Sequence, residues 1–81
     1  MKLLKTIIDE SGNKKYSLKI MESESIIDLK NTGERYAIEK GVTDISWLDC
    51  THPTMGDNKL ADRNTRFTLS ISESEFFVIE K

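Results

Sequence analysis

Cys50 and His52 are the residues best suited to chemistry, because each is the only one of its type in the chain. On an extended backbone, side chains two positions apart point to the same side, so both could reach one metal ion or one substrate. A structural zinc site needs four ligands, and only Asp49 and Asp57 stand nearby to complete the set. A Cys–His nucleophile pair also needs an orienting group and an oxyanion site. We therefore predict no metal, no cofactor and no catalytic residue, and keep a minimal metal or Cys/His site as a third alternative.

No other motif indicates an enzyme. The sequence contains no Walker-type phosphate loop, no G-x-G-x-x-G fingerprint and no H-E-x-x-H zinc motif. The formal net charge is −2, and Lys14-Lys15 is the only pair of adjacent basic residues. Nucleic-acid-binding proteins usually carry a basic patch or stripe, and none is visible here. We predict a protein without catalysis of its own, with a nucleic-acid-binding small β-barrel as the alternative.

The location of the protein is inferred from cysteine usage and hydropathy. A single cysteine excludes an intrachain disulfide, whereas small secreted domains usually carry several bridges. Residues 1–5 lack the apolar core of a signal peptide, and no run approaches the about 18–20 apolar residues of a membrane span. We expect a cytoplasmic protein with no membrane element.

Two segments of the chain, residues 18–29 and 69–79, have similar sequences. Each starts with an alternating apolar run, Leu18 and Ile20 in the first and Leu69 and Ile71 in the second. A short Glu/Ser stretch and another apolar run then follow. A polar break between runs of period two is typical of strand, turn and strand. We therefore predict a hairpin turn at both Glu/Ser stretches.

The same alternation extends along most of the chain. It predicts strands near residues 3–8, 16–21, 26–30, 36–39, 42–48, 67–71 and 76–79, with the first four forming an antiparallel meander and 42–48 either a strand or a wide crossing. We predict one small, mainly β domain spanning residues 1–81. Its antiparallel sheet has five or six strands, arranged as a sandwich or a partly closed barrel.

Helix-capping sequences provide an alternative at both Glu/Ser stretches. Ser72 and Glu75 fit a capping box, but the Phe, Val and Ile residues that follow favour a strand. Ser23 or Ser25 could likewise cap a short helix near residues 23–31. We predict a strand for residues 26–30 and keep that helix as the alternative.

The pattern of alternation also predicts which side chains face the core and which segment lies outside the strands. Periodicity is absent from residues 49–65, which predicts a long irregular loop there, and loops of that length tend to be functional or mobile. The predicted inward set consists of Ile8, Tyr16, Leu18, Ile20, Ile27, Leu29, Tyr36, Ile38, Trp47, Phe67, Leu69, Ile71, Phe77 and Ile79.

Without a catalytic set, a basic tract or a membrane element, protein binding is the leading class of function. We predict an accessory or inhibitory protein that acts by occlusion on another protein. The contact surface is expected in residues 47–66, where side chains are freer of packing. Aromatic, Met and Arg residues are enriched at interfaces. The predicted partner-binding residues are Trp47, His52, Met55, Asp57, Arg63 and Arg66.

Overall fold

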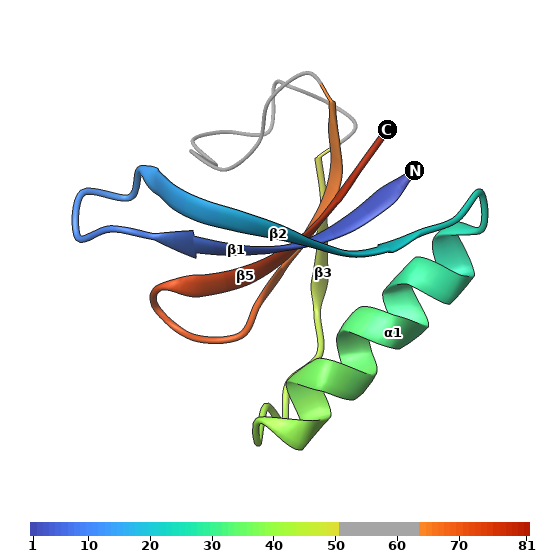
Figure 1. The fold of residues 1–81 in the computed structure, drawn as a ribbon. Coiled ribbons are helices and arrows are strands. Elements are labelled where there is room, and N and C mark those ends of the chain that lie inside the picture. The colour runs from blue at the N-terminus through green and yellow to red at the C-terminus, as the bar shows by residue number, and fades with distance from the viewer. Residues whose placement is uncertain (51–63) are drawn as a thin grey trace.

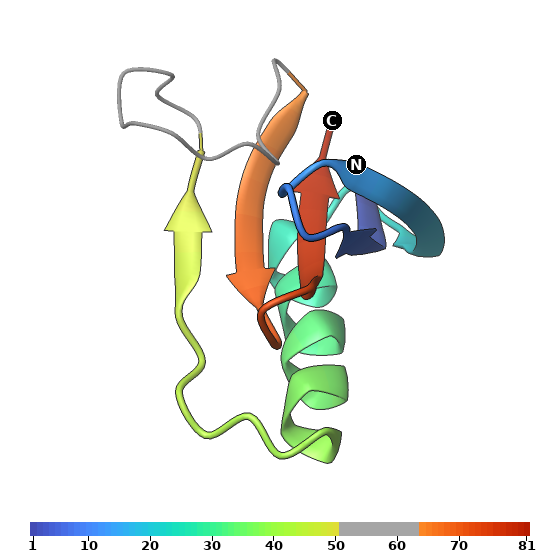
Figure 2. The same ribbon diagram turned by 90° about the vertical axis from the view of Figure 1, so that its left-hand side faces the viewer.

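The computed structural model describes residues 1–50 and 64–81, which form an antiparallel sheet of five strands and one helix (Figure 1). The elements in chain order are β1 (Lys2–Ile8), β2 (Lys14–Glu22), α1 (Ile26–Glu39), β3 (Trp47–Asp49), β4 (Thr65–Ser70) and β5 (Glu75–Glu80). The helix lies across one face of the sheet (Figure 2). The mainly β, antiparallel fold is thus confirmed. In the described residues the sheet is one open layer that does not close into a barrel.

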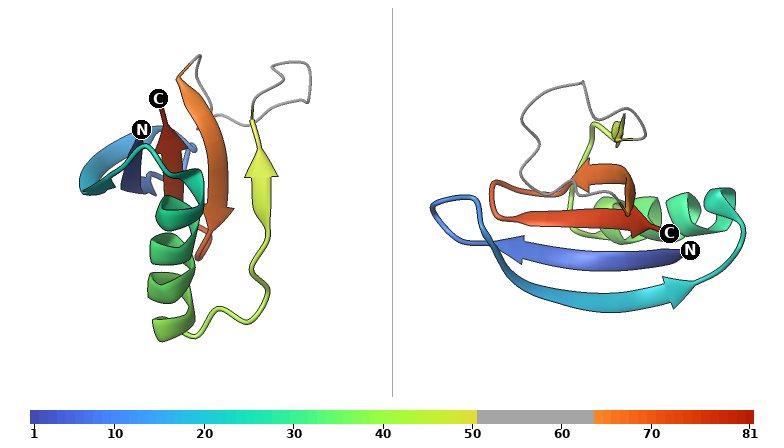
Figure 3. Two further views of the ribbon diagram at one scale, coloured as in Figure 1. Left: turned by 90° about the vertical axis from the view of Figure 1, so that its right-hand side faces the viewer. Right: turned by 90° about the horizontal axis from the view of Figure 1, so that it is seen from above.

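The first and last strands meet inside the sheet. The strand order is β2-β1-β5-β4-β3, and every neighbouring pair is antiparallel. Two hairpins, β1–β2 and β4–β5, are joined by pairing of β1 with β5, in which Leu3 lies opposite Ile79 and Lys5 opposite Phe77. The two edges differ in length, because β2 has nine residues and β3 has three. Figure 3 shows β2 at the outside of the sheet, with β1 between it and β5.

The turn between β1 and β2 is built by Asp9 and Gly12. One carboxylate oxygen of Asp9 accepts hydrogen bonds from the backbone N–H groups of Ser11 and Asn13, each 2.9 Å long. Gly12 has φ of 84°, a left-handed conformation that glycine adopts at low cost. These interactions confirm the turn and the two flanking strands predicted from the sequence.

The prediction is wrong for the first Glu/Ser stretch, which leads into a helix. Ser25 is the N-cap of α1, and its hydroxyl oxygen accepts a hydrogen bond from the Asp28 N–H at 3.2 Å. Leu29, Gly33 and Ala37 then form a buried stripe with the four-residue spacing of a helix. Residues 26–30 and 36–39 are therefore helical, and the predicted four-strand meander does not exist.

The prediction is confirmed for the second Glu/Ser stretch. It forms the turn between β4 and β5, which pair as antiparallel neighbours. The hydroxyl oxygen of Ser72 accepts hydrogen bonds from the N–H groups of Ser74 and Glu75, at 3.4 and 3.2 Å. The expected strand at 42–48 is shorter than predicted, because only Trp47–Asp49 pairs with β4.

The core lies between α1 and the sheet. Its buried hydrophobic residues are Leu3, Leu29, Ala37, Leu69, Phe77 and Ile79, with Ile20, Trp47, Phe67 and Ile71 partly buried against them. The predicted inward set is wrong at residues that are about half exposed or more, which are Tyr16, Leu18, Ile27, Tyr36 and Ile38. The prediction is wrong for Ile27, Tyr36 and Ile38 because they lie in a helix, which period two does not describe. It is wrong for Tyr16 and Leu18 because β2 is the strand at the end of the sheet.

We call the face of the sheet that packs on α1 the helix side. Directly opposite residues of an antiparallel pair share a face. Leu18, Lys5, Phe77, Leu69 and Trp47 therefore form one row across all five strands on the helix side. Figure 1 shows that the turn end of the β1–β2 hairpin extends away from α1. The core thus covers the middle of this row and leaves its β2 end open.

Candidate interaction surface

Tyr16 and Leu18 form the largest pair of neighbouring exposed apolar side chains on the sheet. They pair with Ile7 and Lys5, so both point to the helix side of β2. Their exposed fractions are 49% and 48%, although the strand pattern alone predicts them to be buried. An exposed apolar pair with polar neighbours is a feature of interaction surfaces more than of cores. We refer to Tyr16 and Leu18 as the β2 patch.

Charged side chains border the row of the β2 patch. The Glu75 carboxylate lies 3.1 Å from the Lys40 ammonium at the end of α1 and 3.6 Å from the Lys5 ammonium. The hydrogen bond from Lys40, together with the positive charge of Lys5, lowers the pKa of Glu75 below its ordinary value of 4.5. This ion-pair cluster ties the end of the helix to β1 and β5.

Trp47 is held in the packing between β3 and α1. A Cβ atom added at Gly33 would lie 3.0 and 3.1 Å from Cη2 and Cζ2 of Trp47, so the ring approaches the helix backbone closely. The indole N–H is buried and, among the described residues, has no hydrogen-bond partner. The close fit gives Trp47 a structural role in joining the helix to the edge of the sheet.

The predicted contact segment is only partly described. Of its named residues, His52, Met55, Asp57 and Arg63 lie outside the described residues. Arg66 is half-buried in β4, where the register shifts against β5, and its carbonyl accepts the Cys50 N–H at 2.8 Å. Partner binding by this segment stays a prediction.

Cys50 lies beside polar atoms of the strands around it. Its sulfur is 3.6 Å from the Leu48 carbonyl oxygen and 3.9 Å from the Thr68 hydroxyl. In residues 1–50 and 64–81 no group of three His, Cys, Asp or Glu side chains is placed to hold a metal ion. His52 is not among those residues, so a Cys50–His52 pair is untested.

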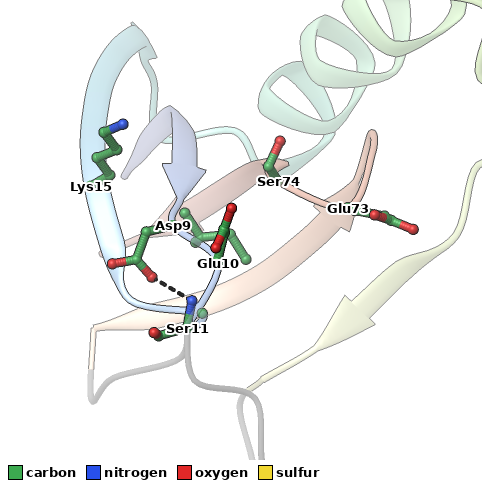
Figure 4. Close-up of a pocket in the computed structure, with 8 residues that line it drawn as sticks. Asp9, Glu10, Ser11, Lys15, Glu73 and Ser74 are labelled. Carbon is green, nitrogen blue, oxygen red and sulfur yellow. Dashed lines mark hydrogen bonds between the residues drawn. The ribbon is translucent and has the colours of Figure 1, made fainter.

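A hollow lies between the β1–β2 and β4–β5 turns (Figure 4). It has a volume of about 750 Å³, and its charged lining residues are Asp9, Glu10, Lys15 and Glu73. In the view of Figure 4, Lys15 and Glu73 lie at opposite ends, with Asp9 and Glu10 between them. Asp9 already accepts two backbone hydrogen bonds, so its carboxylate shapes the turn. Among the described residues that line the hollow, no set of catalytic groups converges.

Comparison with known proteins gives no relative. No protein-family model, no curated protein and no solved structure matches the chain. Within the described part of the chain, no helix is long and apolar enough to cross a membrane. Neither Tyr16 nor Leu18 was singled out as a site residue by the sequence. No signal in the sequence identifies them, because a single sequence does not reveal which strand lies at the edge of a sheet.

Proposed function

We propose that the chain is a small protein-binding accessory or inhibitory protein that covers a surface of its partner, with the β2 patch at the centre of the contact. The observation that supports this proposal is the exposure of Tyr16 and Leu18 side by side on one strand, at 49% and 48%. Tyrosine is enriched at the energetically dominant positions of interfaces. Covering what remains exposed of each side chain would contribute about 1 kcal/mol.

The surrounding charges favour a protein partner over nucleic acid. Lys5 and Lys40 are both paired with Glu75, so these two cations have a carboxylate beside them. Phosphate contacts by unpaired Lys and Arg supply most non-specific affinity for DNA. Nucleic-acid binding remains the alternative function. We expect no sub-micromolar binding to duplex DNA at about 0.15 M salt in an anisotropy assay, and such binding would exchange the order of the two proposals.

The proposed location is based on the cysteine content of the chain. Cys50 is the single cysteine of the chain, so no intrachain disulfide can form, as is usual in proteins of reducing compartments. We propose a cytoplasmic site of action without catalysis, in which the domain works by blocking a surface of the partner.

The experiment is affinity capture from the source cell with matched variants. Tyr16→Ser with Leu18→Ser should release the captured protein while the fold persists, because both side chains are already half exposed. The control variant is Ile27→Ser with Ile38→Ser, which changes two side chains of greater exposure, 70% and 62%, on α1. The control should capture the same protein as the wild type. Equal loss in both variants would contradict a specific role of the β2 patch.

A second set of variants tests the surface predicted from the sequence. Alanine at His52, Met55, Asp57 and Arg63 should weaken capture if residues 47–66 carry the contact. Loss of binding in this set, with full binding by the Tyr16 and Leu18 variant, would move the proposed contact from β2 to that segment. Melting temperatures of all variants identify any that fail to fold.

A further inference from the structure

The direction of the backbone groups of β2 follows from the neighbouring strands. The Ile8 N–H donates to the Ser74 carbonyl on the β5 side at 2.9 Å, so the backbone of Ile8 points toward β5. Backbone groups alternate in direction along an antiparallel strand, so those of Thr6 also point toward β5. Ser17 pairs with Thr6, and the two hydroxyl oxygens are 3.0 Å apart, as in the close, non-hydrogen-bonded type of pair. The N–H and C=O of Ser17 therefore point outward from the sheet.

The same alternation applies to the residues beside Ser17. Lys19 pairs with Leu4, whose backbone also points toward β5, so the backbone groups of Lys19 point outward. Those of Tyr16 and Leu18 point toward β1. In the described residues no strand lies beyond β2, which is the end of the sheet. The outer edge of β2 thus offers two sets of backbone donors and acceptors, with the exposed Leu18 side chain between them and the exposed Tyr16 side chain directly before them.

This edge is protected against pairing with a copy of itself. Lys15 and Ile20 are extra residues, because their neighbours on β2 pair with consecutive residues of β1. Such bulges twist an edge strand and limit the regular stretch to four residues, 16–19. Lysines on the edge also disfavour pairing with an identical edge, because like charges would then lie side by side. A partner must therefore be short and extended, and must tolerate or neutralise positive charge.

The charge of β2 selects the chemistry of that partner. The strand carries Lys14, Lys15 and Lys19, and its single acidic residue is Glu22. Lys19 and Glu22 are 3.2 Å apart with more than half of each side chain exposed, and exposed pairs of this kind contribute little to stability. A carboxylate of a partner can therefore replace Glu22 beside Lys19 at low cost. The β2 edge is complementary to an acidic strand.

We propose that β2 receives an extended acidic segment of a partner protein, which adds a strand to the sheet at Ser17 and Lys19. The inference rests on the proposed protein-binding function and names the chemistry of the segment. Its backbone bonds to the outward groups of β2, and its apolar side chains cover Tyr16 and Leu18 on the helix side. Carboxylates at the alternate positions face the lysines. This is the β-augmentation mode of peptide recognition.

The direct test uses a capped synthetic peptide in which Glu alternates with Val and Ile. We expect saturable binding to the wild-type chain by calorimetry or anisotropy. A peptide with Lys in place of Glu should not bind, and neither should one with a central Pro, which removes a backbone donor. Lys15→Glu with Lys19→Glu should weaken binding of the acidic peptide by about tenfold. Arg35→Glu, a single exposed charge reversal on α1, is the control for a charge change away from β2 and should bind as the wild type does.

Amide hydrogen exchange locates the bound peptide. In the free chain the amides of Ser17 and Lys19 should exchange fast, and those of Tyr16 and Leu18 slowly. The acidic peptide should slow exchange at Ser17 and Lys19. Absence of binding, or protection elsewhere only, overturns the proposal, and so does a concentration-dependent dimer of the free chain joined through β2. If the peptide fails while capture of the cellular partner still requires Tyr16 and Leu18, the proposed function stands and strand addition is wrong.

Discussion

The two similar segments of the chain, residues 18–29 and 69–79, fold differently after an equivalent start. In each, a serine hydroxyl accepts a hydrogen bond from the N–H three residues later, Ser25 from Asp28 and Ser72 from Glu75, both at 3.2 Å. The first serine opens α1 and the second closes a turn into β5. The capping interaction alone therefore does not decide between helix and strand.

The residues after the serine decide the outcome. Leu29, Gly33 and Ala37 place a buried stripe on one face of a helix of 14 residues. After Ser72, the chain continues with Phe76 and then Phe77, Val78 and Ile79, which are aromatic or β-branched residues that favour strands. The three from 77 to 79 are all buried, as in a strand covered on both faces.

The position in the sheet also separates the two segments. Leu18 and Leu69 are corresponding residues at the start of each segment, and both lie on the helix side in the same row. Leu69 is 1% exposed on an inner strand, whereas Leu18 is 48% exposed on an edge. The same residue type thus serves the core in one segment and the surface in the other.

The largest expected effect separates these two leucines. Leu69→Ala should destabilise the chain by about 2–4 kcal/mol, because it leaves a cavity in the core. Leu18→Ala should cost less than about 1 kcal/mol, because half of that side chain is already in water. Urea denaturation measures both changes. Equal losses for the two variants would mean that Leu18 is buried and the strand order is wrong.

A bulky residue at Gly33 tests the packing of the first segment. Gly33→Val should destabilise by about 1–3 kcal/mol, since its Cβ would meet the Trp47 ring at 3.0 Å. Arg35→Val places the same residue on the exposed side of the same helix and is the control. It should destabilise the chain by only about 0.4 kcal/mol, from the lower helix propensity of Val. Thermal denaturation followed by fluorescence of Trp47, the single tryptophan, reports both. A stable Gly33→Val variant with unchanged fluorescence would contradict the contact of α1 with β3.

The two serines provide the next comparison. Ser25→Ala should destabilise by about 1 kcal/mol and reduce helical circular dichroism, because α1 loses its N-cap. Ser72→Ala should cost less, about 0.5 kcal/mol, and leave the helical signal unchanged, because its turn is exposed. A larger loss of stability in the Ser72 variant, or loss of helical signal only in that variant, would mean that the helix follows Ser72 and not Ser25.

The smallest effect is the pH dependence at Glu75. The folded-state pKa of this carboxyl is lowered by the Lys40 hydrogen bond and the Lys5 charge, so its contribution is present above the ordinary value of 4.5 and is lost as pH falls through the folded value. Glu75→Gln should therefore flatten the loss of stability below pH 4.5. Glu73→Gln, on the adjoining exposed turn, is the control. Identical acid titrations of both variants would show that the cluster does not stabilise the fold.

The sequence predicts the strands of this fold better than its helix. β1, β2, β4 and β5 follow from alternation and turn residues, and all four are confirmed. In α1, Ile27 with Leu29 and Tyr36 with Ile38 imitate period two, and Gly33 resembles a turn residue. Its actual role is to admit the Trp47 ring, a contact between distant parts of the chain that local patterns do not contain.

The candidate surface could be predicted only in part. The exposed Lys14 and Lys15 beside the first turn follow from the sequence. The exposure of Tyr16 and Leu18 does not, since an alternating strand looks alike at the edge and in the middle of a sheet. Pairing of β1 with β5 determines that β2 is the edge, and that pairing joins opposite ends of the described chain.

The most direct test of the account is the pattern of nuclear Overhauser effects in the isotopically labelled chain. Successive amide–amide and i to i+3 contacts are expected through residues 26–39, the span of α1. We also expect cross-strand contacts of residues 75–80 with both β1 and β4. Cross-strand contacts linking residues 26–30 to β2, with no i to i+3 contacts, would instead support the four-strand meander. That result would contradict the different folds of the two similar segments and the position of β2 at the edge of the sheet.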